Sequence, residues 1–192
     1  MTALREKLLE VKNLSVSFGS GKRAFTAVRD VNFHIFKGET FGLAGESGSG
    51  KTVFTKSFMG LLEGNGWIDS GSIMYKGRDL AHLRTEKEWL KIRGHEISMV
   101  FQDPMTSLNP LKTIGRQETV ELHQGLKRRA AREKTLEILL DVGISAPEKR
   151  YKQYPHEFSG GMRQRVVIAI AIACLPNVLI CDEPTTALDV TI

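Results

Sequence analysis

Apolar side chains recur at about every second position near the start of the chain, in residues 8–18. This spacing predicts an extended backbone with one buried face, and we expect an edge strand here. A Gly-Ser-Gly-Lys turn follows, and residues 27–36 continue a similar pattern. The first part of the chain therefore predicts two strands joined by a turn.

Later segments alternate between short apolar runs and helical spacing. Strands are predicted at residues 40–44, 72–75, 97–101 and 178–181. Helices are predicted at residues 53–62, 86–93, 128–142 and 166–175. We expect a single domain over residues 1–192 with an α/β core. Within it, residues 105–158 are expected to form a helical subdomain inserted between the core segments 1–104 and 159–192.

The composition indicates the class of protein but does not identify its ligand. The 192 residues are 41% hydrophobic and 26% charged, with a formal net charge of +5, which is typical of a soluble globular protein. The positive charge is compatible with anionic ligands, nucleic acid or a membrane surface, and it selects none of them. The basic residues within 127–134 are interpreted as a solvated helix face, because no aromatic residues alternate with them to stack on bases.

Targeting and redox signals are few. Residues 1–18 carry charges throughout, so we expect no signal peptide. The longest apolar run, residues 166–175, is shorter than the roughly 20 residues of a membrane span, which predicts a buried helix. Cys174 and Cys181 each lie in an apolar run, which predicts two reduced, buried thiols in the cytosol. Any membrane association is expected to come through a protein partner.

The strongest candidate site is a glycine-rich turn with the spacing G-x-x-x-x-G-K-[ST]. Its residues are Gly45, Glu46, Ser47, Gly48, Ser49, Gly50, Lys51 and Thr52. Glycines allow positive φ, so successive N–H groups can face one anion, and the following helix adds its positive end. Lys51 can reach the terminal phosphates of a nucleotide, and the Thr52 hydroxyl can ligate Mg²⁺. A flexible turn is the alternative, which the predicted strand and helix on either side disfavour.

Polar residues at the ends of two predicted strands are the next candidates. Gln102 follows the strand at 97–101, and Asp182 and Glu183 follow the strand at 178–181. Strand ends carry ligand-contacting residues in α/β sheets, so Gln102 can hold a water or Mg²⁺, although an ordinary turn residue is the alternative. Because adjacent side chains on a strand alternate in direction, one carboxylate can serve Mg²⁺ and the other a water. A solvated acidic turn is the alternative for this pair.

Two further features suit a nucleotide ligand. Ser159 can cap the helix that follows it, and Gly160 and Gly161 expose the first N–H groups, which makes a second potential anion site. One nucleotide does not need two such sites, and the residues alone leave this open. Phe18 is better placed than Phe25 to stack on a base, although it can equally well pack in the sheet.

Together these residues resemble the nucleotide-binding subunit of an ATP-binding-cassette (ABC) transporter, over nearly the whole chain. The motifs follow the family's order: Walker A at 45–52, the Q-loop at Gln102, the signature at 159–162, Walker B at 178–183 and the D-loop at 187–189. Residues 99–110 and 154–165 are similar to the dipeptide/oligopeptide/nickel import branch. The resemblance implies a P-loop NTPase core with an antiparallel β edge and an inserted helical subdomain.

The resemblance also implies roles for individual residues. Lys51 and the amides of its turn would hold ATP, and Thr52 and Gln102 would serve Mg²⁺. Asp182 would bind the metal directly or through water. Glu183 would be the base that polarises the attacking water, so Glu183, Gln102 and Lys51 are the expected catalytic residues.

The second anion site has a use in this family, because Ser159 and Gly161 would contact the γ-phosphate of ATP held by a partner's turn. ATP would thus join two ATPase subunits, identical or different. The resemblance also implies two transmembrane permeases, indirect contact with an extracytoplasmic solute-binding protein and no nucleic acid. The expected place is peripheral, on the cytoplasmic face of the cell membrane. Residues 107–110 are our candidate for the permease contact, with an ordinary surface loop as the alternative.

The expected function is ATP hydrolysis that energises the import of dipeptides or oligopeptides, with nickel or another small solute as the alternative cargo. A soluble ABC-type ATPase acting in DNA repair or translation is the alternative function. The short separation of Gln102 and Ser159 leaves no room for the long coiled coil of DNA-repair members, and a second cassette, usual in translation-type members, is not visible. The signature disfavours a plain nucleotide kinase.

The end of the chain carries one more expectation. In this family a switch histidine follows the D-loop, whereas all five histidines of this sequence precede Asp182. We therefore expect that histidine and the last core strands to lie beyond Ile192. As a consequence, this chain is expected to be truncated and poor at ATP turnover alone. Met162 stands where many families have Gln, as it does in the import branch.

Overall fold

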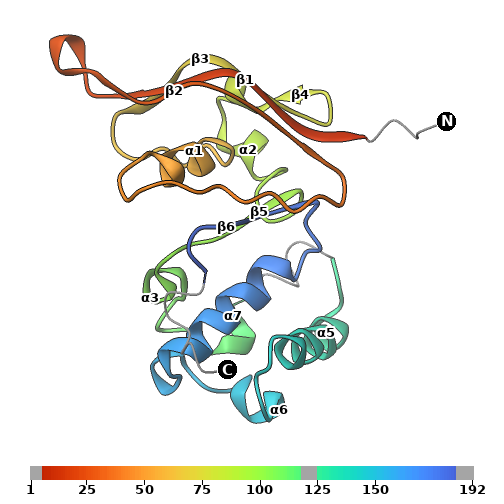
Figure 1. The fold of residues 1–192 in the computed structure, drawn as a ribbon. Coiled ribbons are helices and arrows are strands. Elements are labelled where there is room, and N and C mark those ends of the chain that lie inside the picture. Colours follow the sequence, from red (N-terminus) through yellow and green to blue (C-terminus); the bar gives the residue numbers. More distant parts are fainter. Residues whose placement is uncertain (1–5, 118–124, 185–192) are drawn as a thin grey trace. The chain divides into compact units, whose positions relative to one another are not determined.

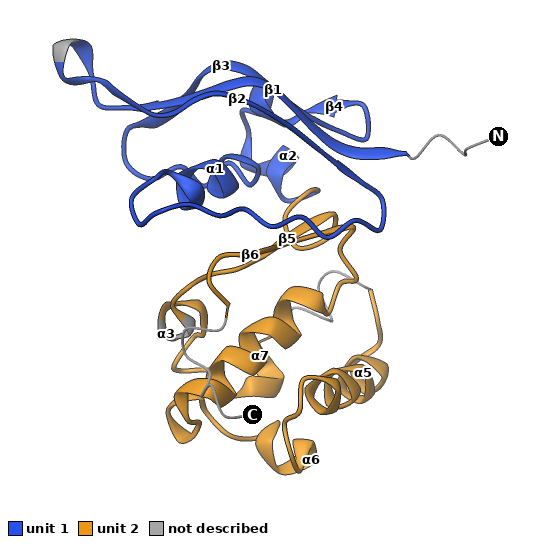
Figure 2. Ribbon diagram, viewed as in Figure 1, with its two compact units in different colours: residues 1–91 blue, residues 92–192 orange. Residues whose placement is uncertain are grey.

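The computed structural model describes residues 6–117 and 125–184. The chain divides into two compact units, residues 1–91 and residues 92–192, which are described separately below (Figure 2). Three sequence features fall wholly or partly outside the described residues, namely the D-loop at 187–189, His123 and the ends of the chain. The predicted division into core segments and a helical subdomain at 105–158 stays a prediction.

The first unit contains a four-stranded antiparallel sheet in the order β2-β1-β3-β4. Its strands are β1 (Lys7–Phe18), β2 (Phe25–Phe36), β3 (Gly66–Tyr75) and β4 (Arg78–Asp79). The prediction that the first strand lies at an edge is wrong, because β1 pairs with β2 on one side and β3 on the other. The predicted strand at 72–75 is the end of the longer β3.

A bulge in β1 explains the loose alternation of its apolar residues. Val11 and Leu14 are both buried although they differ in parity, and the register against β2 shifts between them. Asn13 lies in this shift with a φ of 49°. The extra residue lets Leu14 and the rest of the strand return to the buried face. Opposite the bulge, Gly71 has a φ of +91°, and a Cβ there would lie 2.5 Å from backbone carbonyl oxygens, so only glycine fits.

Helix α1 (Lys51–Ser57) packs against β1 and β2, and α1 and α2 lie on the same side of the sheet (Figure 1). Phe33 of β2 meets Phe54 and Phe58 with ring centroids 5.8 and 6.3 Å apart, so aromatic packing holds the helix to the sheet. The helix is shorter than the predicted 53–62. It ends early because Gly60 takes a φ of +58°, which turns the chain out of the helix.

The predicted strand at 40–44 is wrong, since these residues form no strand in the part of the chain that the structure describes. A strand needs a neighbour for its backbone hydrogen bonds. In the first unit, the described sheet consists of β1 to β4 and does not include this segment. Phe41, at 50% exposure, retains an aromatic contact with Phe33, with ring centroids 4.8 Å apart.

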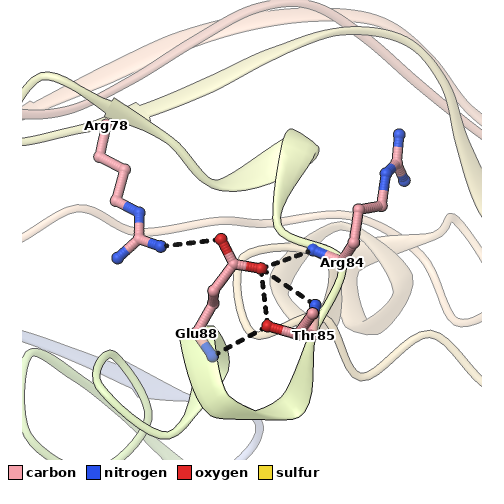
Figure 3. Close-up of polar contacts among 4 residues, drawn as sticks. All are labelled: Arg78, Arg84, Thr85 and Glu88. Carbon is pink, nitrogen blue, oxygen red and sulfur yellow. Dashed lines mark hydrogen bonds and ion pairs between the residues drawn. The ribbon is translucent and has the colours of Figure 1, made fainter.

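Glu88 organises the start of the short helix α2 (Glu86–Trp89), which follows the 3-10 helix Leu80–His82 (Figure 3). The Thr85 side chain accepts from the Glu88 N–H, and one Glu88 carboxylate oxygen accepts from the Thr85 hydroxyl and N–H and from the Arg84 N–H. Arg78 donates to the other carboxylate oxygen at 3.3 Å. The Thr85 and Arg84 donors, followed by the Arg78 charge, lower the pKa of Glu88, although its own desolvation opposes them.

The second unit has a two-stranded parallel sheet, β5 (Ile97–Val100) and β6 (Val178–Cys181). Its described residues form the helices α3 (Pro104–Ser107), α5 (Arg128–Asp141), α6 (Pro147–Arg150) and α7 (Gly160–Ile172), with 3-10 turns at Ile114–Arg116 and Pro155–Glu157. Helix α7 packs against β5, α3 and α5. Val100, Leu139 and Val166, each at most 1% exposed, show that strand and helices share one core.

The predicted strand at 178–181 is confirmed as β6, with one buried and one exposed face. Val178 and Ile180 are buried, whereas Leu179 and Cys181 on the other face are exposed. The prediction of two buried thiols is therefore confirmed for Cys174 and wrong for Cys181. Among the described residues, every helix is too short or too polar to cross a bilayer.

Candidate functional site

The glycine-rich turn at residues 45–52, here called the lysine turn, wraps around the end of its own lysine. The Lys51 ammonium donates to the backbone carbonyls of Gly45 and Glu46, both at 2.8 Å. The Ser49 N–H donates to the Glu46 carbonyl at 3.2 Å, which closes the turn. The ammonium therefore already lies within the turn, where an approaching phosphate could replace carbonyl contacts with charge-assisted ones.

Positive backbone dihedral angles shape this turn. Gly48 has a φ of +79° and Gly50 a φ of +91°. A Cβ on Gly50 would lie 2.7 Å from the Ala27 carbonyl oxygen of β2, whereas a Cβ on Gly48 would meet nothing within 4 Å. Gly50 precedes α1 directly, so the chain enters the helix at Lys51 with the positive end of the helix at the turn. These features fit a phosphate cradle, and the roles predicted for residues 45–52 stay predictions.

At the ends of β5 and β6 the structure brings two predicted residues together. The parallel register pairs Val100 with Cys181, and the Asp182 N–H donates to the Val100 carbonyl at 3.0 Å. Gln102 and Glu183 each lie two residues beyond this last pair of the ladder. The Gln102 side-chain Nε2 donates to Glu183 Oε2 at 2.7 Å. We call Gln102 and Glu183 the strand-end pair.

The backbone at Glu183 is strained. Its φ is 48°, in the left-handed region, which costs about 1–2 kcal/mol for a residue that is not glycine. Such strain persists only when surrounding contacts hold it. Here Asp182, the residue before it, is fixed by the ladder, and the Glu183 side chain is held by Gln102. Residues with strained backbone angles cluster at active sites and ligand-binding sites.

The helix start at Ser159 has the predicted geometry. Ser159 is the N-cap of α7, and its Oγ accepts from the Met162 N–H at 3.3 Å. Gly160 and Gly161 form the first residues of this helix, so no side chain covers its N-terminal amides from those positions. The prediction of a capped, glycine-opened helix start is confirmed, and its contact with a phosphate stays a prediction.

The segment before Ser159 is fixed by a carboxylate that the sequence analysis did not single out. Glu157 accepts from the Tyr154 N–H at 2.7 Å and from Gln153 Nε2 at 3.1 Å. The Tyr154 N–H is the largest cause that lowers the pKa of Glu157; desolvation opposes it, and Gln153, His156 and Arg150 add to it. Glu157 lies three residues after Tyr154, the spacing at which a glutamate can accept from the N-cap N–H, and this spacing could have revealed the contact.

Phe18 lies at the end of β1 and stacks on Phe25, with ring centroids 5.8 Å apart and planes at 20°. Phe25 is the more open of the two, at 61% exposure. Gly66 of the neighbouring strand lies against the Phe18 ring, where an added Cβ would come within 2.6 Å of it. The structure thus pairs the two aromatic candidates, and the preference for Phe18 as the base-stacking residue stays a prediction.

A family model described as ABC transporter matches residues 28–186. The chain belongs to the ABC transporter family. The match covers most of the chain and spans the lysine turn, the strand-end pair and the capped start of α7. Membership in the ABC transporter family thus agrees with the fold class predicted from the motifs.

Named ABC relatives carry the comparison further. The chain is 51% identical over 194 residues to the oligopeptide transport ATP-binding protein AmiE of Streptococcus pneumoniae serotype 4, covering 100% of this chain and 55% of AmiE. It is 53% identical to the dipeptide transport ATP-binding protein DppD of Bacillus subtilis strain 168, covering 97% of this chain and 56% of DppD. The chain therefore spans about half the length of the curated relatives it matches.

Solved ABC structures share the fold. A dimeric, post-hydrolysis structure of the ATP-binding cassette MJ0796 bound to ADP and Pi matches with a TM-score of 0.82 at 29% identity. That match covers 95% of this chain and 76% of the cassette. The P-loop α/β fold of an ABC cassette is thereby established for this chain.

Proposed function

We propose that this chain binds and hydrolyses ATP as the nucleotide-binding subunit of an importer for dipeptides or oligopeptides. The strand-end pair carries the proposal, because it holds a strained carboxylate beside an amide at the ends of two parallel strands. The lysine turn supplies a cation and glycine-shaped backbone for phosphates. The relatives named as oligopeptide and dipeptide transport ATP-binding proteins support the cargo class.

In the proposed reaction Lys51 leaves its backbone carbonyls and pairs with the terminal phosphates of ATP, with the amides of residues 45–50 around them. Glu183 accepts the proton of the attacking water. Gln102 aligns that water or the cation shell. Phosphoryl transfer requires little covalent chemistry from the protein, so positioning and charge neutralisation supply most of the rate.

The donor set fits Mg²⁺. Thr52 offers a hydroxyl, Asp182 a carboxylate and Gln102 an amide carbonyl, which are the hard oxygen ligands that this cation prefers. Because the Gln102 nitrogen faces Glu183, its carbonyl oxygen is the end of the amide suited to a cation. Mg²⁺, when bound, would neutralise charge that develops on the phosphates. Among the described residues no cluster of three or more His, Cys, Asp or Glu forms a metal site of its own.

The capped start of α7 is the part of the site that we expect to contact a second subunit. Ser159, Gly160 and Gly161 offer a hydroxyl and helix amides to an anion. We propose that they contact the γ-phosphate of ATP held by the lysine turn of a partner ATPase subunit. The dimeric state of the solved ABC cassette supports a paired arrangement.

The remaining partners follow from the transporter assignment. We propose two permease subunits, an extracytoplasmic solute-binding protein acting through them, and a peripheral place on the cytoplasmic face of the membrane. For the permease contact we propose the loop at 107–110 together with Leu111, the residue that follows it. Leu108 is buried in the core, whereas Leu111 is 86% exposed beside it, which makes Leu111 the better contact. The Leu111 N–H donates to Asn109 Oδ1, which holds this residue in place.

A soluble ABC-type ATPase acting in DNA repair or translation remains the second candidate, and nickel the second cargo. AmiE and DppD are both named as transport ATP-binding proteins, which favours the transporter. Co-purification distinguishes the two functions. An importer ATPase should purify with membrane permeases, whereas a soluble ATPase of translation or DNA repair should purify with ribosomes or DNA.

The decisive experiment measures ATP-dependent pairing. Glu183→Gln removes the base while keeping the acceptor end of the side chain, so ATP should persist and hold two subunits together. With the partner subunit, ATP and Mg²⁺ present, light scattering after size exclusion should show a dimer. Adding Lys51→Ala should return the protein to a monomer. A Glu183→Gln protein that binds ATP yet stays monomeric with its partner would overturn the proposed arrangement.

A further inference from the structure

Two aromatic rings at the end of the sheet in the first unit differ in how much of each ring a ligand can reach. In the strand register, Phe18 of β1 lies opposite Phe25 of β2 on one side and Gly66 of β3 on the other. The Phe18 ring stacks on Phe25, and an added Cβ on Gly66 would come within 2.6 Å of it. Phe18 thus has a neighbour on each flank. Phe25 lies on the edge strand β2 and is 61% exposed.

Strand β2 also connects Phe25 to the lysine turn. The register of β1 against β2 skips Ala27, so this residue forms a β-bulge. The Ala27 carbonyl oxygen lies where it would be 2.7 Å from a Cβ on Gly50. The lysine turn therefore approaches β2 two residues from Phe25, which is about 7 Å along an extended strand. The ribose of a nucleotide joins its phosphates to its base over a comparable length.

We propose that the base of the bound nucleotide stacks on the ring of Phe25, and that Phe18 is a positioning residue that supports this ring. The inference deepens the proposed function and rests on it, because the lysine turn must hold the phosphates. It assigns the base contact to Phe25 instead of Phe18, since stacking needs a free ring face and Phe25 is the exposed ring of the pair. Stacking tolerates every base, because each base has a π-face. The contact should therefore add affinity for ATP without selecting adenine over guanine.

Two ligands separate the contribution of the base from that of the phosphates. ATP and inorganic tripolyphosphate both offer a phosphate chain to the lysine turn, but only ATP carries a base. Phe25→Ala should raise the Kd for ATP about tenfold, a typical value for the loss of one aromatic–base stack. The Kd for GTP should rise by a similar factor, and the Kd for tripolyphosphate should be nearly unchanged. Isothermal titration calorimetry in the presence of Mg²⁺ measures all three.

Leucine replacements distinguish the roles of the two rings. Leucine keeps an apolar side chain but has no ring face on which a base can stack. Phe25→Leu should therefore lose ATP affinity as Phe25→Ala does. Phe18→Leu should keep most of that affinity, because a supporting side chain needs bulk and not a π-face. A ring that is required at residue 25 and replaceable at residue 18 identifies Phe25 as the base contact.

The effect on folding is measured on the same preparations without nucleotide. The Phe25 ring is mostly exposed, so the melting temperature of Phe25→Ala should stay close to that of the wild type. Phe41→Ala is the matched control, because Phe41 is a half-exposed aromatic of the same unit that contacts Phe33, with ring centroids 4.8 Å apart. This control should leave the ratio of the Kd values for ATP and tripolyphosphate where the wild type has it.

A Phe25→Ala protein that binds ATP as tightly as the wild type would overturn the inference. Equal losses of affinity for ATP and tripolyphosphate would also overturn it, because they would show a disturbed turn and not a lost base contact. A larger loss in Phe18→Leu than in Phe25→Leu would return the base contact to Phe18. A wild-type protein that binds neither ligand would instead overturn the proposed function. The tripolyphosphate titration keeps these failures distinct, because it reports the phosphate site without the base.

Discussion

In the lysine turn, Lys51 donates to carbonyls five and six residues earlier, whereas at the strand ends Gln102 meets a carboxylate 81 residues further along the chain. The turn is built from its own sequence, with glycines at the positions of positive φ. The strand-end pair depends on the register of β5 and β6 and on the core beneath them. The geometry of the lysine turn thus depends mainly on neighbouring residues in the sequence. The position of Glu183 depends instead on the pairing of β5 and β6.

Removing the lysine should produce the largest effect, and it tests whether Lys51 serves the chemistry of the turn without supporting its fold. Lys51→Ala removes the cation from the proposed phosphate site, and we expect turnover to fall by about 10²- to 10³-fold, as for other groups that stabilise transition-state charge. Its carbonyl partners are exposed, so the free energy of unfolding should change by less than about 0.5 kcal/mol. ATPase rates and urea unfolding of the same preparation measure both quantities.

A loss of stability comparable to the loss of activity would contradict this separation. It would mean that the ammonium supports the fold of the turn as well as its chemistry. Lys56→Ala is the matched control, since Lys56 lies five residues further along α1 and pairs with Glu63. It should leave turnover near the wild-type value.

This difference in construction also decides what the sequence can predict. The lysine turn and the Ser159 cap were predicted because each depends on residues a few positions apart. The contact between Gln102 and Glu183 was not predicted, although both residues were chosen, because no local spacing reports the register of two parallel strands. The bulge at Asn13 blurred the alternation of β1 in the same way, since its partner Gly71 lies far along the chain.

The mispredicted segments follow the same physical rule. Residues 40–44 have the apolar composition of a strand but need a neighbour for their hydrogen bonds, and composition does not supply one. Helix α1 ends at Ser57, ahead of Gly60 with its positive φ, although the apolar pattern continues to residue 62. The exposed face of β6 at Cys181 was missed because an apolar run does not tell which face is covered.

A glycine replacement should give the next largest effect, because the lysine turn touches the sheet at one point. Gly50→Ala places a Cβ 2.7 Å from the Ala27 carbonyl at a φ of +91°, whereas Gly48→Ala carries a similar φ of +79° into open space. We expect Gly48→Ala to cost about 1 kcal/mol of unfolding free energy from backbone strain. Gly50→Ala should cost about 1–2 kcal/mol more, because backbone atoms must move. Urea unfolding of the two variants gives the difference directly, and equal losses would show that the contact with β2 does not constrain the turn.

The smallest effect is expected from the local carboxylate caps, one in each unit. Donors around Glu88 and Glu157 hold the pKa of each carboxyl below its ordinary value. A lowered folded pKa contributes stability that is present above the unfolded pKa of about 4.3 and is lost as pH falls through the folded value.

Glu88→Gln and Glu157→Gln should therefore be less stable than the wild type at pH 6 and should approach it as the pH falls below about 4. Because the two caps lie in separate units with no shared partner, their effects should add in the double variant. Thermal unfolding from pH 3 to pH 7 at low salt measures both points. A stability difference that stays constant over this range would mean that the charge of the carboxylate does not contribute, and that the caps act through hydrogen bonds that glutamine can also make.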